Sequence, residues 1–150
     1  MAAKTITLKG DPLRKEGVAD EAITPGHLVE RGGTYDFQKH STAGGPAIAS
    51  FALENDLVGD GVDDAYASDD TVQVGYFSTG EEILAYLATS QVIVVGDYLI
   101  SAGAGLLKKF DPAVDTSSTS ADVYRNSIVA RALEAVTTTS AAARIQVEAV

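Results

Sequence analysis

The 150-residue sequence contains no cysteine and no tryptophan. Without cysteine the chain cannot form a disulfide, carry out thiol chemistry or bind zinc through thiolates. Its longest aliphatic run is Val92 to Val95, far short of the roughly 20 apolar residues that a membrane-spanning helix needs. The first residues include no apolar segment of the kind found in signal peptides, so we expect synthesis and folding in the cytoplasm, and no membrane partner.

Basic residues are missing from the middle of the chain. Between Lys39 and Lys108 there is no lysine or arginine, whereas ten aspartates and glutamates fall there, and this stretch accounts for the net charge of −10. A surface of this charge repels phosphate, so we expect no nucleic-acid partner. The simplest interpretation is a solvated acidic face that keeps the protein soluble.

Motifs for catalysis are also missing. The only histidines are His27 and His40, and neither Gly-x-Ser-x-Gly nor His-Glu-x-x-His occurs. Ser41 follows His40 directly, but neighbouring side chains of a strand point to opposite faces and cannot form a nucleophile–base pair. We therefore predict no enzymatic activity, no catalytic residue and no cofactor.

An acidic loop at residues 54–70 contains Asp60, Asp63 and Asp64. Their order does not match the ligand spacing of an EF-hand. Because clustered carboxylates suit hard cations, a non-standard Ca²⁺ site stays open beside a solvated loop. We assign no metal ligand.

The glycine-rich stretch "VVGDYLISAGAGLLKKF", residues 94–110, could be a phosphate-binding loop or a β-hairpin. The spacing fails both the P-loop pattern and the dinucleotide pattern, which favours a hairpin in which Gly103 and Gly105 supply positive φ. Residues 23–39 repeat the pattern with an offset of 70 and a turn at Gly32-Gly33. The matching pairs are Ile23/Ile93, Gly26/Gly96, Val29/Leu99, Gly33/Gly103, Phe37/Leu107 and Lys39/Lys109. We expect both segments to have the same structural role.

Other segments alternate or concentrate apolar residues as strands do, namely residues 5–9, 47–53, 71–77, 128–135 and 144–150. Residues 79–88 fit either a helix with a Thr79–Glu82 capping box or a short strand. Residues 111–122 and 137–142 are typical of loops. We predict a mainly β fold, a small β-barrel or β-sandwich of jelly-roll or β-tulip type, comprising an extended N-terminal arm (1–20) outside the core and a single β-rich domain (21–150).

Several blocks, taken in order, resemble the small capsid decoration or cement proteins of tailed bacteriophages. They are "KTITLKGDPLRKEG", "ITPGHLVE", "HSTAGG", "FALENDLVGDGVDDAYASDDTVQVGYF", "VGDYLISAGAGLLKK" and "ARALEAVTTTSAAARIQVEAV". The family pattern often has Gly-Asp-Gly-Thr at the second hairpin, where this chain has Gly103, Ala104, Gly105 and Leu106. That departure affects a turn only.

The resemblance implies a virion protein, made in the cytoplasm of a bacterial host, that binds the outside of a phage head. There it would cement neighbouring major capsid protein subunits against internal DNA pressure, and it would be a homo-oligomer, a trimer rather than a dimer. We expect the arm to contact the capsid or a neighbouring subunit through Thr5, Ile6, Leu8, Lys9, Arg14 and Lys15.

Two alternatives stay open. A small β-barrel binding module for carbohydrate or a host surface would require exposed aromatic side chains. An enzyme that uses the acidic loop would require two carboxylates with perturbed pKa values in one pocket.

Overall fold

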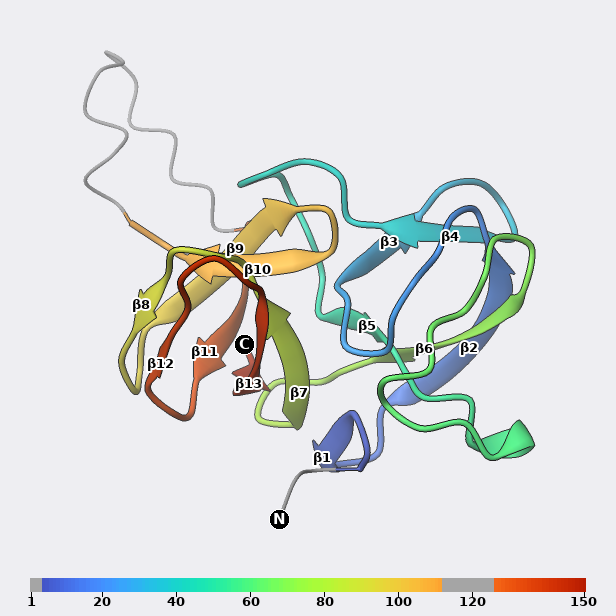
Figure 1. Ribbon diagram of the computed structural model, residues 1–150, viewed down its shortest axis with the longest axis horizontal. Coiled ribbons are helices and arrows are strands. Elements are labelled where there is room, and N and C mark those ends of the chain that lie inside the picture. Colours follow the sequence, from blue (N-terminus) through green and yellow to red (C-terminus); the bar gives the residue numbers. More distant parts are fainter. Residues whose placement is uncertain (1–3, 112–125) are drawn as a thin grey trace.

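A computed structural model describes residues 4–111 and 126–150. Within these ranges the chain forms short strands joined by turns, one 3-10 helix, η1 (Asp56–Val58), and no α-helix. The strands gather in two lobes that lie side by side (Figure 1). The predicted mainly β fold is confirmed. Most of the predicted loop at residues 111–122 lies outside the described residues.

The N-lobe is a five-stranded sheet with the order β3-β4-β2-β6-β5. Its strands are β2 (Leu13–Ala19), β3 (Val29–Arg31), β4 (Asp36–Lys39), β5 (Ser50–Ala52) and β6 (Thr71–Tyr76). A bridge between Leu28 and Phe51 joins the two ends of the sheet and curls it. Phe37, Val72 and Val74 lie in its core and are fully buried.

The C-lobe is a closed barrel in which β13 pairs with both β11 and β7. Its strands are β7 (Glu82–Leu87), β9 (Tyr98–Gly103), β10 (Leu106–Lys109), β11 (Ile128–Ala132) and β13 (Ala143–Ala149). Strand β1 (Thr7–Lys9) pairs with the start of β7, and β8 (Val92–Ile93) pairs with β12 (Val136–Thr137) in a separate ribbon. The predicted barrel is therefore present in this lobe.

The two lobes have the same topology. The order β3-β4-β2-β6-β5 of the N-lobe matches β9-β10-β7-β13-β11 of the C-lobe, and in each lobe the second and third strands of that order run parallel while the other neighbours run antiparallel. The sequence offset of 70 also holds at one position outside the hairpins, because the Ile23↔Tyr66 bridge corresponds to the Ile93↔Val136 pair. The chain is therefore a tandem repeat of one structural unit.

The turn that precedes β3 shows how closely the units agree. Thr24 donates its backbone N–H to His27 Nδ1 at 3.1 Å, and at the equivalent place Val94 donates its N–H to Asp97 Oδ2 at 2.9 Å. Gly26 and Gly96 have φ values of 96° and 92°, a conformation that side chains rarely adopt. A ring nitrogen in one lobe thus has the role of a carboxylate oxygen in the other.

The predicted N-terminal arm outside the core is wrong for residues 6–19. Ile6 is fully buried in the core of the C-lobe, and its N–H donates to Glu54 Oε2 at 2.9 Å. Strand β2 lies between β4 and β6, and Ala19 at its end is buried. The predicted boundary at residue 20 therefore falls within the N-lobe.

In the segment 79–88, for which helix and strand were both open, residues 82–87 form strand β7. The strand pairs over its whole length with β13 and closes the barrel, so tertiary pairing decides against the helix. The turn before the strand is closed by the Ser78 N–H, which donates to Glu81 Oε2 at 2.8 Å, in place of the Thr79–Glu82 capping box that a helix would have had.

Candidate functional site

The six residues predicted to contact a capsid lie on β1, on β2 and just before β1, and they differ in accessibility. Thr5, Lys9, Arg14 and Lys15 are exposed, Leu8 is half-buried against the C-lobe core, and Ile6 is fully buried. Ile6 therefore cannot contact a partner, and its prediction as an interface residue is corrected. Contact by the other five stays a prediction.

The exposed basic side chains are held loosely by neighbours. Lys9 Nζ lies 3.3 Å from Glu82 Oε1, and Arg14 Nη1 lies 3.7 Å from Asp56 Oδ1. Lys15 Nζ lies 4.6 Å from the centre of the Tyr76 ring. Exposed ion pairs contribute about 0–1 kcal/mol, so these cations can exchange one partner for another at little cost.

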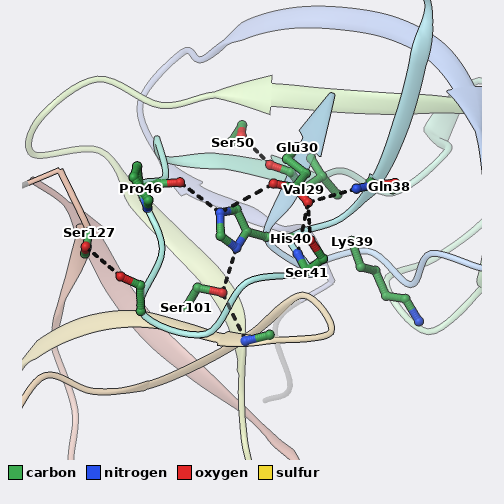
Figure 2. Close-up of polar contacts among 12 residues, drawn as sticks. Val29, Glu30, Gln38, Lys39, His40, Ser41, Pro46, Ser50, Ser101 and Ser127 are labelled. Atoms are coloured by element: carbon green, nitrogen blue, oxygen red, sulfur yellow. Dashed lines mark hydrogen bonds and ion pairs between the residues drawn. The ribbon is translucent and has the colours of Figure 1, made fainter. Parts of the chain in front are cut away.

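A buried polar cluster centred on His40 joins the two lobes (Figure 2). His40 Nδ1 lies 2.8 Å from Ser101 Oγ on β9, and His40 Nε2 lies 3.0 Å from the Pro46 carbonyl oxygen. Because a carbonyl only accepts, Nε2 carries the proton, and in the neutral ring Nδ1 accepts from the Ser101 hydroxyl. Ser101 Oγ accepts in turn from the Gly103 N–H at 3.1 Å.

Glu30 completes the cluster on the solvent side. Its Oε1 accepts from Gln38 Nε2 at 2.9 Å and from the N–H and hydroxyl of Ser41 at 3.0 and 2.8 Å. Partial burial would raise the pKa of Glu30, but these hydrogen bonds outweigh it, so the pKa lies below its usual value. Glu30 Oε2 lies 3.6 Å from His40 Nε2.

A serine, a histidine and a carboxylate in contact invite comparison with a hydrolase triad. In such a triad the nucleophile contacts Nε2 and the carboxylate contacts Nδ1, whereas Ser101 lies at Nδ1 of His40 and Glu30 lies near Nε2. Ser101 is also fully buried, so a substrate cannot reach its hydroxyl. The geometry suits a structural connection between lobes, and the lack of enzymatic activity stays a prediction.

The hairpin of the sequence "ISAGAGLL" supplies part of the same junction. Ala104 and Gly105 both have positive φ, as a tight β-hairpin turn requires. Gly105 accepts a hydrogen bond from the Leu28 N–H at 2.8 Å, and a side chain on Gly105 would lie 3.0 Å from His27 Cβ. The glycines therefore let the C-lobe hairpin dock against the N-lobe, and the predicted hairpin is confirmed.

Arg144 on β13 forms a second connection between the lobes. Its guanidinium donates to the Pro25 carbonyl at 2.9 Å, to the Val62 carbonyl and to Asp63 Oδ1 at 3.2 Å, and it stacks 4.3 Å from the centre of the Tyr86 ring. His27 packs beside the same ring, with centroids 5.1 Å apart. Burial, then the positive charges of Lys39 and Arg144, lower the pKa of His27 to about 4.

The carboxylates of the acidic loop serve separate local contacts. Asp63 pairs with Arg144, while Asp64 Oδ2 accepts from the Gly61 N–H at 2.7 Å. Asp70 Oδ2 accepts from the Ala67 N–H at 2.8 Å. In the part of the chain that the structure describes, no three such side chains converge in a way that could hold a metal ion.

A groove of about 520 Å³ runs along the surface between the segments at residues 47–49 and 77–79. Phe77 and the exposed side chains of Ile48 and Val150 contribute apolar surface to it. None of its described lining residues carries an ionisable side chain. Among the described residues there is also no helix long and apolar enough to cross a membrane.

The chain matches no protein-family model and no curated protein sequence. Its fold is similar to the crystal structure of the head fiber gp8.5 N base of bacteriophage phi29, with a TM-score of 0.55 and 12% sequence identity. The likeness covers 92% of this chain and 93% of the other, so it spans both lobes. At this identity the comparison establishes a shared fold.

Proposed function

We propose that the chain is a structural protein of a tailed-bacteriophage virion. The observation that carries this proposal is the end-to-end likeness of both lobes to the base of a phage head fiber. The ordered blocks of sequence that resemble phage head decoration proteins support it independently of the fold. Where the structure describes it, the chain consists of short strands and turns, and the Ser101 hydroxyl in contact with His40 is buried, which fits a structural role.

The more specific part of the proposal is attachment to the outer surface of the head, where the protein cements neighbouring major capsid protein subunits. A protein that binds only the assembled shell stabilises it by RT ln(1 + [L]/Kd), about 2.7 kcal/mol per site at a hundredfold excess over Kd. Many equivalent sites on one shell multiply this effect. We propose a homotrimer as the bound form, because closed cyclic symmetry matches symmetric positions on a shell.

The alternative of a carbohydrate-binding module requires exposed aromatic side chains that lie close together. Among the described tyrosines the two most exposed are Tyr35 in the β3–β4 turn and Tyr98 on β9, which belong to different lobes. We therefore prefer the virion protein.

The test uses heads from the phage whose genome encodes the chain, prepared without its gene. Purified protein should bind these heads to saturation, and bound heads should release DNA at a higher temperature than bare heads. The mass of the free protein by light scattering should be that of a trimer. Failure to bind would refute attachment to the head, and binding without a change in DNA release would refute cementing.

A further inference from the structure

The outer edge of β7, on the side away from β13, is covered by other parts of the chain. Leu84 donates its N–H to the Ile6 carbonyl at 2.8 Å, Tyr86 to the Gly26 carbonyl at 3.2 Å, and Ala88 to the Leu107 carbonyl at 2.8 Å. Strand β1, the turn before β3 and strand β10 thus share this edge. No long open strand edge is left here for another chain to pair with.

The equivalent edge of β2 in the N-lobe is covered only in part. Val18 donates to the Tyr35 carbonyl and Asp20 to the Phe37 carbonyl, each at 2.9 Å. Glu16 pairs with Gln73 in the N-lobe as Leu84 pairs with Gln146 in the C-lobe. Glu16 is therefore the structural equivalent of Leu84. Since alternate residues of a strand direct their N–H groups to the same side, Arg14 and Glu16 also point outward. Within residues 4–111 and 126–150, neither has a backbone partner on this side.

The surroundings of this edge are open and partly apolar. Residues 13–16 are all exposed. Leu13 is 63% exposed at the start of the strand, and Tyr35 is 76% exposed where its carbonyl meets Val18. An open strand edge flanked by large exposed apolar side chains is a favourable place for strand addition.

We propose that the outer edge of β2 at Arg14–Glu16 binds an extended strand of the protein on which the chain is mounted, as β1 pairs with β7 in the C-lobe. The inference rests on the proposed function and adds how the partner is held. The backbone of the partner strand would pair with Arg14 and Glu16, and its apolar side chains would cover Leu13 and Tyr35.

Charge defines the chemistry of the bound strand. In the C-lobe, Lys9 of β1 pairs with Glu82. The N-lobe residue equivalent to Glu82 is Arg14. Arg14 pairs with Gly75 on β6 as Glu82 pairs with Glu148 on β13. The bound strand therefore carries a carboxylate opposite Arg14. A second copy of β1 would place Lys9 against Arg14, and like charges in facing positions repel.

The backbone test replaces Glu16 by proline, which removes the outward N–H and leaves the inward ladder to β6 in place. Its matched control is Glu16→Ala, which removes the same side chain but keeps the N–H. On heads prepared without the gene, Glu16→Pro should bind at least tenfold more weakly than wild type, and Glu16→Ala within threefold. Thermal melting verifies that both variants fold.

Amide hydrogen exchange of the wild type should slow at Glu16 on binding. Tight binding without protection of Glu16, or equal binding by a folded Glu16→Pro variant, would overturn the inference while the proposed function stands.

A peptide tests binding at the β2 edge without phage heads. The probe is a capped peptide of residues 5–10 with the substitution K9E, which places a carboxylate opposite Arg14. It should shift the amide resonance of Glu16 in ¹⁵N-labelled protein, whereas the same peptide with Lys9 retained should bind at least fivefold more weakly. If wild type does not bind heads but the peptide shifts Glu16, the proposed function fails and the edge site remains. If neither peptide perturbs Glu16, the inference is wrong.

Discussion

Replacement of Ile6 by alanine tests the finding that the first residues belong to the core. Ile6 is fully buried, its N–H is bound by Glu54 and its carbonyl by Leu84. Truncation of a buried isoleucine to alanine costs about 2–5 kcal/mol. For a chain of this length each kcal/mol lowers the melting temperature by roughly 2–4 °C, so we expect a decrease of roughly 4–20 °C.

The assay is thermal and urea denaturation followed by circular dichroism. Two exposed neighbours are the controls, since Thr5→Ala and Leu13→Ala should each change the free energy of unfolding by about 0.5 kcal/mol or less. A chain that lacks residues 1–20 loses β2 from between β4 and β6 and should not melt cooperatively. If Ile6→Ala costs under 1 kcal/mol, or if the truncated chain melts cooperatively, residues 6–19 are not part of the core.

Two further predictions concern single positions in the N-lobe. A Cβ on Gly17 would lie 2.5 Å from the Tyr35 carbonyl oxygen, so Gly17→Ala should lower the free energy of unfolding by about 1–3 kcal/mol in urea melts. The control Gly61→Ala should be neutral, because the nearest atom to its new Cβ would be 3.6 Å away. Equal effects of the two substitutions would contradict the close approach at Gly17. The pKa of His27 is about 4 in the folded chain and 6.5 in the unfolded chain, so the unfolded state binds the proton first and stability should fall as pH drops from about 6.5 toward 4. His27→Asn, which can accept the Thr24 N–H as Asp97 accepts that of Val94, should remove this part of the pH dependence; an unchanged pH profile would show that His27 is not its source.

The strands that could be predicted are those whose apolar residues face one core. Strand β13 alternates Ile145 and Val147 inward with polar residues outward, and β6 is bounded by clear turns. The hairpin at Gly105 could be predicted because its spacing excludes known phosphate loops. Each of these segments carries its structural signal within a few neighbouring residues.

Strand β2 could not be predicted, because Arg14, Lys15 and Glu16 are exposed and only its end is buried. The residues that join the lobes also carried no local signal. Ser101 is separated from His40 by 61 positions in the sequence and Glu30 by 10. Only the fold brings these three side chains together. The offset of 70 was visible between the two hairpins, but the different loop lengths elsewhere hide the repeat in the remaining strands.

The tandem arrangement also determines the order in which the chain can fold during synthesis. All strands of the N-lobe lie within residues 13–76, so that lobe is complete in sequence when about half of the chain has been made. The barrel of the C-lobe needs β13 and cannot close until the last residues are available. Because units fold as they emerge from the ribosome, the N-lobe should form first. Strand β1 is synthesised before every other strand, yet its partner β7 begins only at residue 82. The first strand to be made therefore remains unpaired until the second half of the chain appears.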